Sequence, residues 1–308
     1  MFNVHRMRIL REIAARGSIV AAADALYMSP SAISQQMSTL EREAGVELLE
    51  RAGRGVRLTD AGQRLVAHTE RVLAVLEEAQ ADMAAVAEGV AGRLNTSAFP
   101  TAARALLVPA LARLKERYPR VPFTMTDLEP EESIPALKVG DLDLVVTYEF
   151  DHLPEPADPG VERHLLVTEQ MYVAVPTAHP LAGGPIHIAD FRDEQWIVGR
   201  DGSPFLDVQL RVAAEAGFAP RVDLQSNDYQ VILAAVSAGL GVALVPPLGM
   251  FASYPGVRFL EPHDTDIHRR VVAVVRKGSG GAPVIAAAIE ALREAAAAAA
   301  CSVQVPGR

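Results

Sequence analysis

Three short runs near the N-terminus place hydrophobic residues at the spacing of an amphipathic helix. Their apolar positions are Met7, Leu10 and Ile13 in the first run, Ala22, Ala23 and Leu26 in the second, and Ile33, Met37 and Leu40 in the third. Positions three and four apart lie on one face of a helix, so each run predicts a helix with one buried side. Gly17 is placed to end the first helix, and Ser18 is placed to cap the second. Two short helices joined by a three-residue turn, with a third helix before them, are typical of a helix-turn-helix.

The third helix has a polar face made of short hydroxyl and amide side chains. It begins at Ser29 and Pro30, a capping residue followed by the residue favoured at the first helical position. The polar face contains Ser31, Ser34, Gln35 and Ser38. The segment VELLERAGRGVRLTDAG follows and predicts a two-stranded wing, with Arg51, Arg54 and Arg57 near its tip. A solvated face of a helical bundle could explain the polar stripe alone. The wing favours a nucleic-acid recognition surface, because Ser and Gln can bind base edges and Arg can bind phosphates.

A long helix is expected next, from the capping residue Thr59 to about residues 86–88, followed by Gly89 and Gly92. Its seam alternates steps of four and three through Leu65, Thr69, Val72, Leu76, Ala79, Met83 and Val86. This period of 3.5 residues is that of a coiled coil, and about 30 residues would span roughly 45 Å. Packing on its own domain is the alternative interpretation. A seam on a helix that joins two domains favours dimerisation with a second copy of the chain.

From residue 94 the pattern changes to alternating strands and helices. Strands are expected at 94–99, 121–128 and 142–148, with helices at 101–119 and 131–141 between them. Two successive strand–helix–strand units predict a mostly parallel sheet. The segment 165–182 interrupts this rhythm with antiparallel strands. A second α/β set covers 195–246, with helices at about 204–216 and 228–238, and a strand at 269–278 and an Ala-rich helix near 283–299 complete the chain.

Length and charge agree with a chain of several parts. At 308 residues and 32.9 kDa, two or three domains are expected. The formal net charge is −9, but residues 1–60 carry 8 Arg and 7 acidic residues and the remainder has a net charge of −10. An acidic body disfavours indiscriminate attraction to polyanions, whereas a near-neutral head can still place single Arg groups on phosphates.

Several function classes find little support in the residues. No apolar run reaches about 18 residues and the N-terminus lacks a signal-peptide pattern, so a cytoplasmic protein without a membrane partner is expected. The single cysteine, Cys301, has no partner for a disulfide or a metal cluster. The cluster of acids and histidines at 261–268 matches no common metal site and is interpreted as a solvated loop. No catalytic constellation, metal site or cofactor motif is expected.

The segment GSIVAAADALYMSPSAISQQMSTLEREAGVELLERAGRGVRLTDAGQRLV resembles the DNA-binding domain of LysR-type transcriptional regulators, and the resemblance extends over about residues 5–295. Further matching stretches are LVPALARLKERYPRVPFTM, GDLDLVVT, YVAVPTAHPLA and VSAGLGVALVP. The resemblance implies a multidomain chain: a mostly α winged helix-turn-helix, a linker helix, and a two-lobed α/β effector domain similar to type 2 periplasmic binding proteins.

The implied boundaries place the DNA-binding domain at 1–58, the linker helix at 59–91, the effector domain at 92–300 and a tail at 301–308. Lobe 1 would comprise 92–164 and 268–300, and lobe 2 would comprise 165–267. The chain would cross between the lobes near Arg163–Val167 and near His263–Arg269. By position, Ser29, Pro30, Ser31, Ser34, Gln35 and Gln36 fall on the family's recognition-helix contacts, and Arg51 and Arg54 fall on its wing. Many members have Gln at the position of Pro30, where this chain offers only an apolar contact.

The expected effector site lies between the lobes. Ser97 and Thr101 flank the first helix of lobe 1, while Ser203 and Asn227 precede helices of lobe 2. Helix starts attract anions, so these residues predict a small organic acid as effector, although each residue could serve only as a cap. Thr147 ends a strand, where ligands of such sheets bind, and Phe99, Phe205 and Tyr148 could supply apolar contacts. Arg200 lies close enough in sequence to add positive charge.

The leading hypothesis is a ligand-responsive transcription factor that binds an interrupted palindromic operator as a dimer or a dimer of dimers. Its expected partners are double-stranded DNA, a small-molecule effector, a second copy of itself and RNA polymerase. A transport-type binding protein is the first alternative, but about 90 N-terminal residues would then have no role. A small-molecule enzyme is the second, and it lacks a catalytic constellation.

Overall fold

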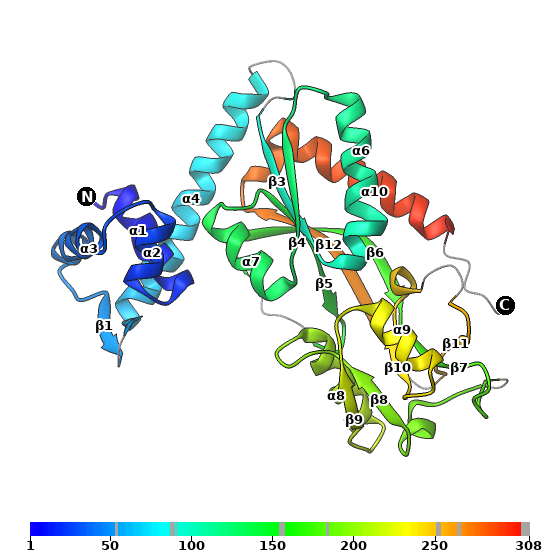
Figure 1. The fold of residues 1–308 in the computed structure, drawn as a ribbon. Coiled ribbons are helices and arrows are strands. Elements are labelled where there is room, and N and C mark those ends of the chain that lie inside the picture. The colour runs from blue at the N-terminus through cyan, green and yellow to red at the C-terminus, as the bar shows by residue number, and fades with distance from the viewer. Residues whose placement is uncertain are drawn as a thin grey trace.

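The chain forms a small helical head, a long helix and two α/β lobes (Figure 1). The computed structural model describes residues 1–52, 55–86, 90, 92–153, 158–182, 185–250, 254–263 and 266–302. Within these residues no helix is both long and apolar enough to cross a membrane. No three His, Cys, Asp or Glu side chains of the same residues gather in a way that could hold a metal ion.

The head contains the three expected helices and the expected hairpin: α1 (Val4–Arg16), α2 (Ile19–Ala25), α3 (Pro30–Ala44), β1 (Leu49–Ala52) and β2 (Gly55–Leu58). The Ser29 hydroxyl caps α3 by accepting from the Ala32 N–H at 3.1 Å. Gly17 and Gly45 end α1 and α3 with φ of 71° and 70°, a conformation that favours glycine. The core joins the buried faces of the three helices: Met7, Ile9, Leu10, Ile13, Ala22, Ala23, Ile33, Met37 and Leu40, with Leu48 and Leu65.

The long helix α4 (Asp60–Val86) begins as expected, with the Thr59 hydroxyl accepting from the Gly62 N–H at 3.1 Å. The first part of its seam is used within the chain, which differs from the expectation. Leu65 is buried in the head core, and Thr69 is fully buried. The remainder is exposed at Val72, Leu76, Ala79 and Met83, whereas the side chain of Val86 lies outside the described part.

Lobe 1 is built on a five-stranded sheet in the order β4-β3-β5-β12-β6. The strands are β3 (Leu94–Ala98), β4 (Phe123–Asp127), β5 (Leu144–Phe150), β6 (Val161–Gln170) and β12 (His268–Arg276). The β3 strand pairs in parallel with β4 and β5, as expected, and β12 runs antiparallel to both of its neighbours. Alternate residues of β5 and β12 face opposite sides, one covered by α6 (Val108–Arg117) and α10 (Pro283–Ser302), the other by α7 (Pro130–Val139). The short turn η4 (Ser279–Gly281) precedes α10.

The first helix of lobe 1 is not continuous, which corrects the expectation of one helix over 101–119. It consists of α5 (Pro100–Ala102), a π-helical segment η1 (Ala103–Leu107) and α6. Pro109 has no N–H to donate to the carbonyl four residues before it, and a wider turn accommodates this lost hydrogen bond.

Lobe 2 contains two small sheets. One is the antiparallel set β10-β7-β11 and the other is the parallel pair β8-β9. Their bounds are β7 (Tyr172–Pro176), β8 (Gln195–Val198), β9 (Arg221–Gln225), β10 (Ala243–Val245) and β11 (Val257–Leu260). The helical elements are η2 (Ile188–Phe191), α8 (Pro204–Glu215), α9 (Tyr229–Ser237) and η3 (Pro247–Gly249).

The chain passes between the lobes twice. The β6 strand stays paired with β12 up to Gln170, and β7 of lobe 2 starts at Tyr172. The first crossing therefore lies after Gln170, several residues beyond the expected 163–167. The second lies between Leu260 and His268, where it was expected.

Candidate functional site

The helix α3 lies on the side of the head away from the two lobes (Figure 1), and its polar face is exposed. Ser31, Ser34, Gln35 and Ser38 are all exposed there. Three hydroxyls here are engaged locally: Ser29 caps the helix, Ser31 Oγ shares a hydrogen bond with Ser29 Oγ at 3.0 Å, and Ser34 Oγ donates to the Pro30 carbonyl at 2.9 Å. The side-chain amide of Gln35 forms no hydrogen bond with the described residues and is therefore available to bind a base edge.

The other expected contacts of the head have different surroundings. Gln36 is half-buried, and its Oε1 accepts from Arg6 Nε at 3.0 Å, so its amide helps to join α3 to α1. On the wing, the exposed Arg57 forms an ion pair with Glu50 at 2.7 Å. Arg51 lies in β1, its side chain outside the described part, and Arg54 lies outside the described residues altogether.

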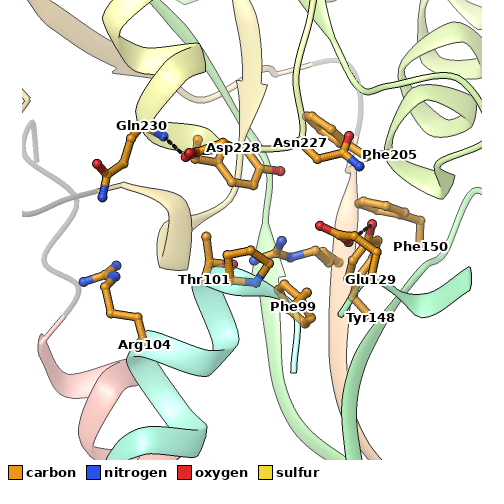
Figure 2. A pocket seen from close by; sticks show the side chains of 13 residues that line it. Phe99, Thr101, Arg104, Glu129, Tyr148, Phe150, Phe205, Asn227, Asp228 and Gln230 are labelled. Atoms are coloured by element: carbon orange, nitrogen blue, oxygen red, sulfur yellow. Dashed lines mark hydrogen bonds between the residues drawn. The ribbon is translucent and has the colours of Figure 1, made fainter. Parts of the chain in front are cut away.

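A pocket lies where the two lobes meet (Figure 2). It contains about 580 Å³ of empty space, a figure that includes the part open to solvent. Five expected effector residues line it: Phe99, Thr101, Tyr148, Phe205 and Asn227. The remaining lining residues are Pro100, Arg104, Glu129, Phe150, Asp228, Tyr229, Gln230 and Arg269. The carboxyl ends of β3 and β5 open into this pocket, as expected for a ligand site of such a sheet.

Three expected effector residues are not part of the lining. Ser203 is buried, and its hydroxyl caps α8 by accepting from the Leu206 N–H at 3.2 Å. Ser97 and Thr147 are buried on adjacent strands, and neither hydroxyl has a hydrogen-bond partner among the described residues. Arg200 is exposed and contributes through its backbone N–H, which donates to Asn227 Oδ1 at 2.9 Å.

Aromatic rings form most of the apolar lining. Phe99 meets Tyr148 edge-on at a centroid distance of 4.8 Å on the lobe 1 side. Phe205 and Tyr229 are 5.4 Å apart on the lobe 2 side. The pocket is therefore flanked by flat apolar surfaces from both lobes, which suit the carbon skeleton of a small metabolite.

A buried ion pair joins β6 and β12 next to the two segments where the chain passes between the lobes. Arg269 on β12 donates to Glu169 Oε2 on β6 through Nε at 2.9 Å and Nη2 at 2.6 Å. The other carboxylate oxygen of Glu169 accepts from the Leu248 N–H of η3 at 2.6 Å. The guanidinium also stacks on Phe99 and Tyr148, with centroid distances of 5.1 and 5.6 Å. These contacts place the positively charged Arg269 guanidinium, paired with Glu169, in the pocket wall at the point where the lobes are connected.

An acidic side chain faces this positive charge from the loop before α7. Glu129 is half-buried and accepts from Tyr148 Oη at 3.4 Å. Burial raises the pKa of Glu129 to about 7, and repulsion from Glu131 adds to the increase. Within the described residues no Lys, Arg or His is close enough to Glu129 for an ion pair.

The sequence did not point to Glu129 or Arg269. The one available indication for Glu129 was its place just after a strand, where ligand-binding residues gather. For Arg269 there was none, because its partner Glu169 lies 100 residues away along the chain and only the pairing of β12 with β6 brings the two together.

Comparisons with known proteins agree with this arrangement. Residues 4–63 match the bacterial regulatory helix-turn-helix protein family of lysR type, and residues 87–297 match the LysR substrate binding domain. The chain is 29% identical over 277 residues to the transcriptional dual regulator GltC of Bacillus subtilis, with 89% of this chain and 90% of GltC covered. It is 30% identical over 273 residues to the HTH-type transcriptional regulator ShiR of Corynebacterium glutamicum, with 84% of this chain and 88% of ShiR covered.

One similar solved structure contains DNA. Full-length CbnR in complex with its target DNA is 26% identical to this chain, with a TM-score of 0.54 and coverage of 96% of this chain and 100% of CbnR. The winged head, the linker helix and the two lobes thus occur together in DNA-binding regulators. The protein belongs to the LysR family of transcriptional regulators, with an N-terminal DNA-binding helix-turn-helix and a ligand-binding domain.

Proposed function

We propose that this regulator responds to a small organic acid bound in the pocket between the lobes. As a dimer or a dimer of dimers it binds an interrupted palindromic operator, and effector binding controls transcription by RNA polymerase. The division at residues 58, 91 and 300 into head, linker helix, effector domain and tail belongs to this proposal. The exposed α3 face supplies base contacts, with Arg51 and Arg54 of the wing on the phosphates.

The Thr101 hydroxyl carries the effector part of the proposal. Thr101 is 7% exposed, lines the pocket, and its Oγ1 has no hydrogen-bond partner in the described part of the chain. A buried hydroxyl without a partner is costly, and a ligand oxygen would satisfy it. Because Arg269 supplies positive charge from the same pocket wall, a carboxylate is the group that suits both.

Binding between the lobes would favour one relative arrangement of lobe 1 and lobe 2. The head is attached to lobe 1 through α4, so this preference can reach the operator-binding surfaces. A coupling free energy of about 1–3 kcal/mol would change operator affinity roughly 5- to 150-fold.

The test uses operator fragments recovered from genomic DNA with the wild-type protein. Carboxylic acids are titrated by calorimetry, and operator affinity is measured with and without each acid. We expect Thr101→Val, which removes the hydroxyl and keeps the volume, to weaken effector binding by about 1 kcal/mol, roughly fivefold. Thr168→Val, an exposed position on β6, is the matched control. Tight binding of a wholly apolar ligand, or equal affinity of Thr101→Val and wild type, would contradict the proposal.

A further inference from the structure

The polar groups of the pocket fall into two chemically different ends. Thr101 and Arg104 lie on one side in Figure 2, and Glu129 lies on the other with Tyr148. The Arg269 guanidinium also lines the pocket, stacked on Phe99 and Tyr148. A simple carboxylate would satisfy only one of these ends, because a second carboxylate, that of Glu129, already faces the pocket.

Arg269 still has donor capacity for a ligand. Its Nε and Nη2 both donate to Glu169, whereas Nη1 donates no hydrogen bond within the described part of the chain. Together with the unpartnered Thr101 hydroxyl, this nitrogen gives a ligand carboxylate two donors.

Glu129 forms no ion pair with a cationic side chain of the described residues. Among the described residues its side chain has one hydrogen bond, the 3.4 Å contact from Tyr148 Oη, and two pocket residues near it, Phe150 and Phe205, are apolar. An acid that is half-buried among aromatic rings without a cationic partner is unfavourable in its charged form. A protonated amine on the ligand would provide the missing partner.

We infer that the effector carries a protonated amine as well as a carboxylate, the carboxylate bound by Thr101 and Arg269 and the amine by Glu129. This inference rests on the proposed organic-acid function and narrows it to amino acids and related zwitterions. In an α-amino acid the two groups are separated by one carbon, and the side chain would pack against the adjoining rings of Phe205 and Tyr229, which contact each other on the lobe 2 side.

Proton release provides a direct signature. Burial and repulsion from Glu131 raise the pKa of Glu129 to about 7, because together they outweigh the hydrogen bond from Tyr148 and the attraction of Arg269 and Arg200. Tyr148 on β5 and Tyr229 on α9 are the other titratable groups facing it, and burial keeps the pKa of both far above neutrality. A bound amine stabilises the carboxylate, so at neutral pH a fraction of a proton passes from Glu129 to the solvent on binding. Affinity for the amine-bearing ligand should then increase with pH up to about 7 and level off above it.

The test titrates the common L-amino acids against the full-length protein, together with their counterparts in which hydrogen or hydroxyl replaces the α-amino group. We expect one amino acid to bind wild type at least tenfold more tightly than both counterparts, with proton release detected from the buffer dependence of the calorimetric heat. Glu129→Gln should abolish this preference and the proton release, while its affinity for the deamino acid stays the same or increases. Glu132→Gln, an exposed acid on the following helix α7, should behave as wild type.

The other possible results of this test would contradict the inference, and some would also contradict the organic-acid proposal. If carboxylic or hydroxy acids bind as tightly as the amino acids, the inference is overturned and the organic-acid proposal stands. If Glu129→Gln weakens the amino acid and its counterpart equally, Glu129 does not recognise the amine and the inference is again overturned. If amines without a carboxylate bind as tightly, or if no probe binds at millimolar concentration, both the inference and the organic-acid proposal fail.

Discussion

Two neighbouring glutamines on α3 show how one residue type takes different roles one position apart. Gln35 is exposed, whereas Gln36 is half-buried and bound to Arg6 at 3.0 Å. Successive residues of a helix point about 100° apart, so only one of the two can face a DNA groove squarely. The resemblance placed both at the DNA, and the contacts within the head favour Gln35 as the base-reading residue.

Replacing Gln35 by Ala should weaken binding to the specific operator by about 1–3 kcal/mol, because an amide that bonds a base edge is lost. Binding to random DNA should hardly change, since phosphate contacts supply most of that affinity. Fluorescence anisotropy with both DNAs measures the two effects. Gln63→Ala, an exposed amide on the first turn of α4, is the control. Equal losses on operator and random DNA would remove Gln35 from base readout.

The pocket residues that could be predicted from the sequence are those at recognisable local positions. Phe99, Thr101 and Asn227 sit at helix starts or strand ends, and such positions can be recognised from a short stretch of sequence. Glu129 and Arg269 act through partners brought in by the fold. The buried pair of Arg269 with Glu169 depends on the register of two antiparallel strands, which no local pattern specifies.

At the scale of elements, α4 combines two kinds of packing on one seam. Leu65 and Thr69 are buried at the head end, while Val72 and Met83 remain 38% and 66% exposed in the single chain. Leu76 also lines a groove that α4 forms with lobe 1, so a change there would affect two contacts at once. The exposed positions at Val72 and Met83 are therefore the better probes of pairing with a second copy.

Val72→Glu combined with Met83→Glu should dissociate the dimer, because four charges would meet along the paired seam. Loss of the tether removes the effective-concentration gain of two heads, so affinity for a full operator should fall about 10²- to 10⁴-fold. Sedimentation and operator titration measure both changes. The conservative pair Val72→Ile and Met83→Leu should leave the dimer intact. A double-Glu variant that remains dimeric with normal operator affinity would show that the dimer contact lies elsewhere.

Most elements could be predicted from periodicity, but their ends and irregularities could not. The three head helices and the parallel β3, β4 and β5 follow from spacing and caps. The π-helical segment at 103–107 arises from a hydrogen bond that Pro109 cannot make, and an otherwise regular apolar pattern conceals it. The first crossing between the lobes was expected too early in the chain, because the half-exposed residues of β6 remain paired with β12 through Gln170.

At the scale of the whole molecule, the head and α4 are held against lobe 1 by charged contacts. Arg276 at the end of β12 forms an ion pair with Glu77 of α4 at 2.7 Å. Arg16 of α1 pairs with Asp141 after α7 at 2.9 Å, and Arg11 donates to the Val139 carbonyl at 3.4 Å. A movement of lobe 1 would thus be transmitted to α4 and the head through several contacts at once.

The tightest approach in this region is at Gly278, where a Cβ would overlap the Ala74 carbonyl oxygen of α4. Gly278 has φ of 88°, so Gly278→Ala adds backbone strain as well as a clash. Gly217, with φ of 81°, has no atom within 4 Å of the place that a Cβ would take. Gly217→Ala therefore isolates the strain, which is roughly 1–2 kcal/mol for Ala.

We expect Gly278→Ala to lower the free energy of unfolding by more than Gly217→Ala and to accelerate hydrogen exchange of α4 amides near Ala74. Because α4 would then be displaced from lobe 1, the effector should lose much of its influence on operator affinity, whereas Gly217→Ala should retain it. Equal destabilisation and unchanged α4 exchange in the two variants would show that this contact does not hold the helix to the lobe.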